Sequence, residues 1–118
     1  MHETTKLNLG IVGACGRGAS FKAACEAAGN VRIAAVCDTN AERLTEAAAR
    51  LGAAEQYVSY EEMIEKARLD AVILGTPMPL HVPQAIQALR HGLHVLSEVP
   101  AGVSVDECRE LVQVAAAS

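Results

Sequence analysis

The sequence predicts a doubly wound α/β domain, in which helices cover both faces of a parallel sheet. Short apolar runs alternate along the chain with segments whose apolar residues recur at helical spacing, which is typical of parallel strands joined by helices. Residues 71–74 are apolar throughout, as in a strand that is buried on both faces. The 118 residues, 51% hydrophobic and 20% charged, fit a single domain with one core and exclude intrinsic disorder.

Five strands are expected, at residues 7–12, 31–37, 56–58, 71–74 and 94–97. A helix follows nearly every strand, and right-handed crossovers place the strands in one sheet. A complete fold of this kind has a sixth strand after the last helix, and the sequence ends at Ser118 before one. We therefore expect a sheet truncated at strand 94–97, with Val95 and Leu96 on an unpaired apolar edge that pairs with a second copy of the chain.

Three helix starts have the spacing of a capping box, in which a hydroxyl residue is followed three positions later by a glutamate. These segments begin at Thr39, Ser59 and Ser104, which are therefore the predicted helix caps. Glycine favours the left-handed conformation that ends many helices. The predicted helix stops are Gly29, Gly52 and Gly92.

Composition excludes several classes of partner. A formal net charge of −4, with basic residues scattered singly, argues against nucleic acid, whose phosphates require clustered Lys and Arg. The apolar runs are far shorter than the roughly 20 residues of a membrane span, so we expect no membrane segment and no signal peptide. The four cysteines lack metal-ligand spacing, which predicts reduced thiols, a cytoplasmic location and no metal site.

A glycine-rich turn lies between the first strand and the helix that follows it. Its residues are Gly13, Ala14, Cys15, Gly16, Arg17 and Gly18. In dinucleotide-binding (Rossmann) folds such a turn places a pyrophosphate on free amides at the helix N-terminus, with Gly13 for the tight turn and Gly18 for close packing. The middle glycine of G-x-G-x-x-G falls on Cys15 and is displaced to Gly16, so the match is imperfect. The alternative is a turn that serves chain geometry alone.

Asp38 ends the second strand, 20 residues after Gly18, where these folds carry the acidic residue that binds the ribose of adenosine. The 2′-phosphate of NADP would lie about 4 Å from this carboxylate, a repulsion of about 1 to 4 kcal/mol. We therefore expect Asp38 and the adjacent Thr39 to contact a cofactor that is NAD rather than NADP. The alternative is that Asp38 caps the following helix.

Taken in order, four stretches of the chain resemble the N-terminal half of the Gfo/Idh/MocA family of NAD(P)-dependent oxidoreductases. They are residues 11–18, 36–38, 75–81 and 91–100, and the resemblance covers almost the whole chain. In this family the turn after the fourth strand lies beside the ribose and nicotinamide half of the cofactor. A later Glu-Lys-Pro motif brings its glutamate near the nicotinamide ribose. The resemblance thus implies that Thr76, Pro77, His81 and Glu98 line the cofactor cleft.

The residues taken alone also allow ordinary structural roles at these positions. Pro77 fits a helix start that is delayed by proline. His81 fits a solvated position in the first turn of the helix, and Glu98 fits an ordinary loop carboxylate.

One position departs from the family's motif. Val99 replaces the lysine that is a usual candidate for acid/base catalysis in the family, and valine cannot transfer a proton. The resemblance implies an oxidoreductase that moves hydride between NAD and a sugar or cyclic polyol derivative. Residues 1–118 would form its dinucleotide-binding domain without the substrate domain, and this isolated chain would be inactive. The alternative is a non-catalytic module that binds or senses NAD.

Overall fold

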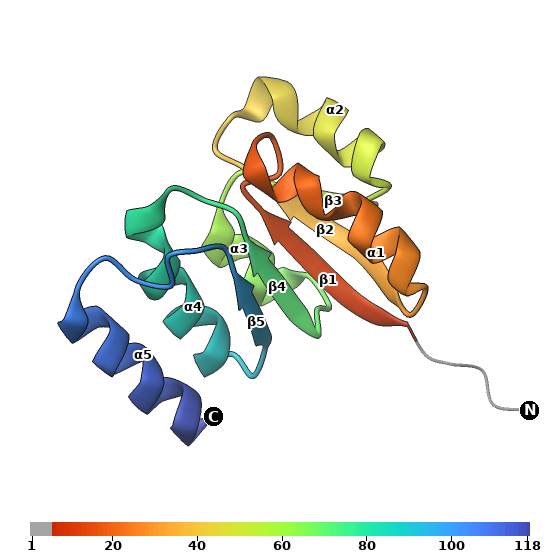
Figure 1. Cartoon of the computed structure of the whole chain (residues 1–118). Coiled ribbons are helices and arrows are strands. Elements are labelled where there is room, and N and C mark those ends of the chain that lie inside the picture. Colours follow the sequence, from red (N-terminus) through yellow and green to blue (C-terminus); the bar gives the residue numbers. More distant parts are fainter. Residues whose placement is uncertain (1–5) are drawn as a thin grey trace, which may run out of the picture.

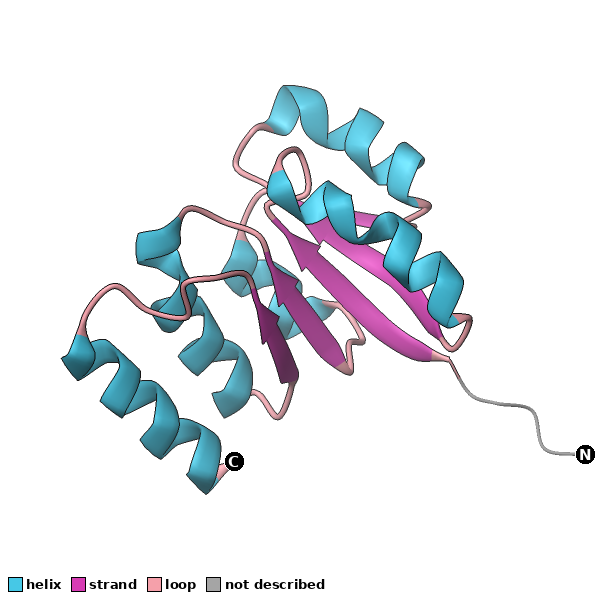
Figure 2. Cartoon of the chain, in the orientation of Figure 1, coloured by secondary structure: helices cyan, strands magenta, loops and turns pink. Residues whose placement is uncertain are grey.

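The computed structural model describes residues 6–118 and contains one five-stranded sheet (Figures 1 and 2). Its strands are β1 (Leu7–Val12), β2 (Val31–Cys37), β3 (Glu55–Tyr57), β4 (Ala71–Leu74) and β5 (His94–Ser97). They lie in the order β3-β2-β1-β4-β5, and every neighbouring pair is parallel. The sheet therefore grows outward from β1 in both directions, which confirms the predicted doubly wound fold.

Helices cover both faces of the sheet (Figure 1). On one face lie α1 (Lys22–Ala28) and α2 (Ala41–Leu51). On the other lie α3 (Tyr60–Lys66) and α4 (His81–Arg90), and α5 (Val105–Ala117) packs against α4. Two short 3-10 helices, η1 (Arg17–Phe21) and η2 (Met78–Leu80), lead into α1 and α4. None of the helices within the described residues is long and apolar enough to span a bilayer.

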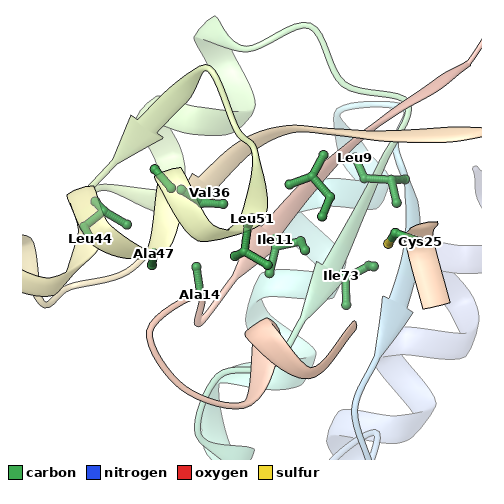
Figure 3. Close-up of a cluster of buried hydrophobic side chains, with 11 residues drawn as sticks. Leu9, Ile11, Ala14, Cys25, Val36, Leu44, Ala47, Leu51 and Ile73 are labelled. Atoms are coloured by element: carbon green, nitrogen blue, oxygen red, sulfur yellow. The ribbon is translucent and has the colours of Figure 1, made fainter. Parts of the chain in front are cut away.

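Two apolar clusters fill the space between the sheet and its helices. The first contains side chains of α1 and α2, among them Cys25, Leu44 and Leu51 (Figure 3). The second, on the opposite face, contains side chains of α3 and α4. Ile73 of β4 belongs to the first cluster and its neighbour Val72 to the second. The fourth strand is thus buried on both faces, as its unbroken apolar sequence predicted.

Two of the three predicted helix caps are confirmed by the structure. Ser59 caps α3 and Ser104 caps α5, each through its side-chain oxygen. The prediction that Thr39 caps α2 is wrong, because Asn40 is the cap and its Oδ1 accepts a hydrogen bond from the Arg43 amide at 3.2 Å. Asparagine is among the strongest helix caps. The helix therefore begins one residue later than the capping-box spacing predicted. All three predicted glycine stops have positive φ.

The two edge strands of the sheet are β3 and β5, and both can be compared with the strands predicted from the sequence. β3 spans Glu55–Tyr57 rather than residues 56–58, because the parallel ladder with β2 ends where Cys37 pairs with Tyr57. At the other edge, β5 pairs only with β4 among the described residues. The side chain of Leu96 on this edge is 55% exposed. The edge predicted to be unpaired is therefore unpaired in the part of the chain that is described.

The last helix lies at the margin of the fold. No residue of α5 is fully buried, and Val105 and Val112 are each 67% exposed. A cavity of about 680 Å³ runs along the helix, with Val103 and Cys108 also in its wall. None of the residues predicted to bind a cofactor lines this cavity.

Candidate functional site

The residues predicted to bind a cofactor gather at the carboxyl edge of the sheet. The glycine-rich turn follows β1, Asp38 follows β2, Thr76 follows β4 and Glu98 follows β5. Because the strands are parallel, their carboxyl ends share one edge. β1 has β2 on one side and β4 on the other, so the strand order reverses here. Open α/β sheets bind their ligands at such a topological switch point.

Two glycines of the turn, Gly13 and Gly18, are packed more closely than a side chain would allow. Gly13 has a φ of +80°, and a Cβ built there would lie 2.5 Å from the carbonyl oxygen of Gly75. A Cβ on Gly18 would lie 2.7 Å from Ile11 Cγ2 and 2.8 Å from the Gly13 oxygen. A Cβ on Gly16 would have no neighbour nearer than 4.0 Å. The turn therefore needs glycine at positions 13 and 18, in the geometric roles predicted for them, whereas a Cβ at position 16 would meet no close neighbour.

Asp38 joins the end of β2 to the glycine-rich turn. Its Oδ2 accepts a hydrogen bond from the Cys15 amide and its Oδ1 accepts one from the Asn40 amide, each at 2.9 Å. Since Asn40 is the cap of α2, the alternative interpretation of Asp38 as the helix cap is wrong. The two bonds fix the carboxylate beside the crevice, and each oxygen keeps a further lone pair for a ligand.

The thiols near the site are neutral. Burial, and then the charge of Asp38, raises the pKa of Cys15. Burial raises the pKa of Cys37 to about 12. Both thiols therefore keep their protons near neutral pH, and neither is a ready nucleophile or metal ligand. Within residues 6–118 there is no group of three or more His, Cys, Asp or Glu side chains that could hold a metal ion.

A cavity of about 170 Å³ opens beside Asp38. Thr39, Thr76 and Pro77 also line it, so the segments after β2 and β4 share one space. The sequence analysis did not predict six other residues in its wall, which are Val12, Cys37, Val58, Tyr60, Leu80 and Gln84. Gln84 ties the wall together, because its carbonyl accepts from Tyr60 Oη and its Oε1 accepts from Thr76 Oγ1, both at 2.7 Å.

An ion pair links the glycine-rich turn to the segment after β5. Arg17 donates from Nε to Glu98 Oε2 at 3.2 Å and from Nη2 to Glu98 Oε1 at 3.4 Å. The Arg17 side chain is 62% exposed and that of Glu98 is 21% exposed. An exposed pair of this kind contributes at most about 1 kcal/mol. Its geometric effect is larger, since it brings together two predicted site residues that lie 81 positions apart.

His81 lies at the start of α4 and is 1% exposed, so the alternative of a solvated surface histidine is wrong. Its Nδ1 is 2.7 Å from the carbonyl oxygen of Pro100, and its Nε2 is 2.8 Å from that of Thr76. Both ring nitrogens therefore face backbone of the protein, and any direct contact of His81 with a cofactor stays a prediction.

Comparison with protein families gives a match over residues 7–118. The matching model is GFO_IDH_MocA, an oxidoreductase family with an NAD-binding Rossmann fold. The matched residues contain every strand and helix of the structure.

Similar proteins include a glycosyl hydrolase family protein and two dehydrogenases of known structure. A glycosyl hydrolase family 109 protein from Saccharopolyspora erythraea is 37% identical over 122 residues, which covers 94% of this chain and 26% of the relative. The WlbA dehydrogenase from Bordetella pertussis, solved in complex with NADH and UDP-GlcNAcA, has a TM-score of 0.88 and 33% identity. That match covers 95% of this chain and 34% of the solved one. The scyllo-inositol dehydrogenase from Lactobacillus casei, solved with NAD(H) and scyllo-inositol, has a TM-score of 0.88 and 27% identity. That match covers 96% of this chain and 34% of the solved one.

The chain thus spans about a quarter of the length of the curated relative and about a third of each solved one. Because the relatives are named as dehydrogenases and glycosyl hydrolases, the alternative of a non-catalytic module finds no support. The family match and the parallel five-stranded sheet agree with each other. The chain belongs to the GFO_IDH_MocA oxidoreductase family, as an NAD-binding Rossmann domain.

Proposed function

We propose that residues 7–118 bind NAD(H) at the carboxyl edge of the sheet, as the cofactor-binding part of an oxidoreductase acting on a sugar or cyclic polyol derivative. The observation that carries this proposal is the cavity that Asp38, Thr39 and Thr76 share beside the close-packed glycine turn. The substrate class is supported by the solved relatives, which hold UDP-GlcNAcA or scyllo-inositol together with the nicotinamide cofactor.

In the proposed complex, the adenosine half of NAD occupies the cavity and its ribose hydroxyls donate to Asp38. Each carboxylate oxygen uses one lone pair on a backbone amide and has a second lone pair for a hydroxyl. Binding therefore requires neither backbone bond to break. The same carboxylate repels the 2′-phosphate of NADP, which is the physical basis for a preference for NAD.

The pyrophosphate of NAD lies over the glycine-rich turn in this proposal. Ala14, Cys15 and Gly16 have small side chains or none, which lets the backbone approach the phosphates. Arg17 supplies an exposed guanidinium, which forms strong hydrogen bonds with phosphate oxygens. Its partner Glu98 then lies on the nicotinamide side, as the family resemblance implies.

Val99 leaves the domain without the proton-transferring lysine of the family motif. Hydride removal from an alcohol requires a group within hydrogen-bond reach that takes the hydroxyl proton. Val99 is 78% exposed and cannot do this, and both ring nitrogens of His81 face backbone carbonyls. We therefore place the base outside residues 7–118, which the greater length of the relatives supports.

The purified chain is expected to bind NADH weakly, with a Kd on the order of 0.1 to 1 mM, because this domain alone encloses only part of the dinucleotide. Isothermal titration calorimetry measures the affinity. As a control, Val112→Glu alters the cavity along α5 and should leave the affinity unchanged. A folded chain that gives no heat of binding with millimolar NADH, or a Val112→Glu variant that loses binding, would overturn the proposed site.

Self-association through β5 is a separate expected property of this chain. Within residues 6–118, β5 pairs on one side only and has the exposed Leu96 side chain on that strand, and an unpaired edge of this kind is a template for pairing with another chain. Analytical ultracentrifugation should detect a concentration-dependent dimer, and Leu96→Lys should shift it toward monomer. A clean monomer at high concentration, with freely exchanging β5 amides, would contradict pairing through this edge.

A further inference from the structure

The most deeply buried polar side chain among the described residues is His81. Its imidazole lies between two carbonyl oxygens that belong to different loops at the carboxyl edge of the sheet. One is the Thr76 oxygen, in the turn after β4, and the other is the Pro100 oxygen, in the segment after β5. A side chain that bridges two loops sets their separation, and neither contact is explained by the cofactor contacts proposed above.

The two loops depend on this bridge to different degrees. The turn after β4 has anchors of its own, since the Gly75 amide donates to the Val12 carbonyl at 2.9 Å and Thr76 Oγ1 donates to Gln84. In the segment after β5, the Glu98 amide donates to the Leu74 carbonyl at 3.0 Å. Among the described residues, the Pro100 oxygen is then the one backbone group of positions 99–102 that is hydrogen-bonded to another element, and its partner is His81.

We propose that His81 is a positioning residue, which holds the Glu98–Pro100 segment against the turn after β4 and so sets the place of the nicotinamide half of NAD without touching it. This inference rests on the proposed function, because Glu98 is the cofactor-side group in the held segment. Loss of the bridge frees the Pro100 end of this segment, and Glu98 is then held by its amide bond to Leu74 and its exposed ion pair with Arg17. The independently anchored turn and the Asp38 cavity keep their places. The nicotinamide half is therefore held less firmly, while the adenosine half is unaffected.

The two contacts of His81 depend on which nitrogens of its imidazole ring carry a hydrogen. Carbonyl oxygens only accept, so the contact with Pro100 is a hydrogen bond when Nδ1 carries a hydrogen. A hydrogen on Nε2 as well would let the same ring donate to Thr76. Nitrogen-15 NMR of the histidine-labelled chain counts these hydrogens directly. We expect a Nδ1–H signal of His81 that exchanges slowly with water, and a Nδ1 without hydrogen would overturn the proposal.

Two substitutions separate positioning from simple destabilisation. His81→Leu keeps an apolar volume and removes both ring nitrogens, and His81→Gln keeps an NH2 group that can donate to one of the two carbonyl oxygens. His91→Gln is the matched control, because His91 is exposed and its Nδ1 contacts only Gln87 of its own helix. Calorimetry is run on each folded variant with NADH and with ADP, which contains the adenosine and pyrophosphate but no nicotinamide ribose.

The expected result is a loss of about tenfold in NADH affinity for His81→Leu, with ADP affinity within about twofold of the unmodified chain. His81→Gln should lie between the two, and His91→Gln should match the unmodified chain with both ligands. Equal losses for NADH and ADP, or no loss for either, would overturn the positioning role. If the unmodified chain binds neither ligand, the proposed function itself fails, so the two failures are distinguishable. Should the variants not fold, the NMR measurement on the unmodified chain decides alone.

Discussion

Gly13→Ala is expected to destabilise the domain by about 2 to 5 kcal/mol, a large part of the total stability of a domain of this size. Two effects combine at this position. The left-handed backbone, with φ of +80°, disfavours any residue with a Cβ, and that Cβ would lie 2.5 Å from the Gly75 carbonyl oxygen. Backbone atoms cannot rotate away as side chains do, so β1 and the turn after β4 must separate. Urea denaturation followed by circular dichroism measures the loss.

Two glycines in the same chain serve as controls for these effects. Gly92 has a φ of +77° with nothing within 4 Å of an added Cβ, so Gly92→Ala isolates the conformational cost of about 1 to 2 kcal/mol. Gly16 lies in the same turn as Gly13 and has open space around an added Cβ, so Gly16→Ala changes this turn without a steric clash. A Gly13→Ala variant no less stable than Gly92→Ala would show that the close contact with Gly75 does not constrain the fold.

Asp38→Asn is expected to remove most of the preference for NADH over NADPH. The repulsion of about 1 to 4 kcal/mol between the carboxylate and a 2′-phosphate corresponds to a preference of about fivefold to several hundredfold in the unmodified chain. Asparagine carries no charge and keeps one oxygen that accepts from a backbone amide, but its NH2 group replaces the other acceptor, so the change removes the charge together with one of the two amide hydrogen bonds. The ratio of the two dissociation constants, measured by titration, is the readout.

Asp38→Ala provides the comparison, since it also removes the acceptors of the Cys15 and Asn40 amides. Asp38→Ala should also narrow the preference for NADH over NADPH. It should weaken binding of both cofactors as well, because the glycine-rich turn loses its hydrogen bond to the residue that ends β2. Tighter binding of NADPH than of NADH by the unmodified chain would refute the role given to Asp38.

The fold and the position of the site follow from local patterns in the sequence. Strand spacing and the unbroken apolar run at residues 71–74 predict parallel strands, and parallel strands bring their carboxyl ends to one edge. The glycine-rich turn and Asp38 are therefore placed correctly relative to each other without any knowledge of tertiary contacts.

Other features depend on contacts between distant segments, which no local pattern contains. Gln84 enters the cavity wall because α3 and α4 cover the same face of the sheet and share one apolar cluster, so that Tyr60 reaches its backbone carbonyl from 24 positions away. His81 follows two prolines and looks like a surface residue locally, but Pro100 covers it from 19 positions away. Asn40 caps α2 in place of Thr39 and its amide donates to Asp38; the capping-box spacing does not reveal which of two neighbouring polar side chains becomes the cap.

The weak packing of α5 affects how the domain unfolds locally. Because α5 buries no residue fully and rests mainly on α4, its detachment exposes little apolar surface that is not already in water. Opening of α5 therefore requires much less free energy than disruption of the sheet, whose β4 is buried on both faces. We therefore expect two cooperative units, a stable one that carries the crevice and a weak one, α5, which can detach and rebind without disturbing Asp38 or the glycine-rich turn.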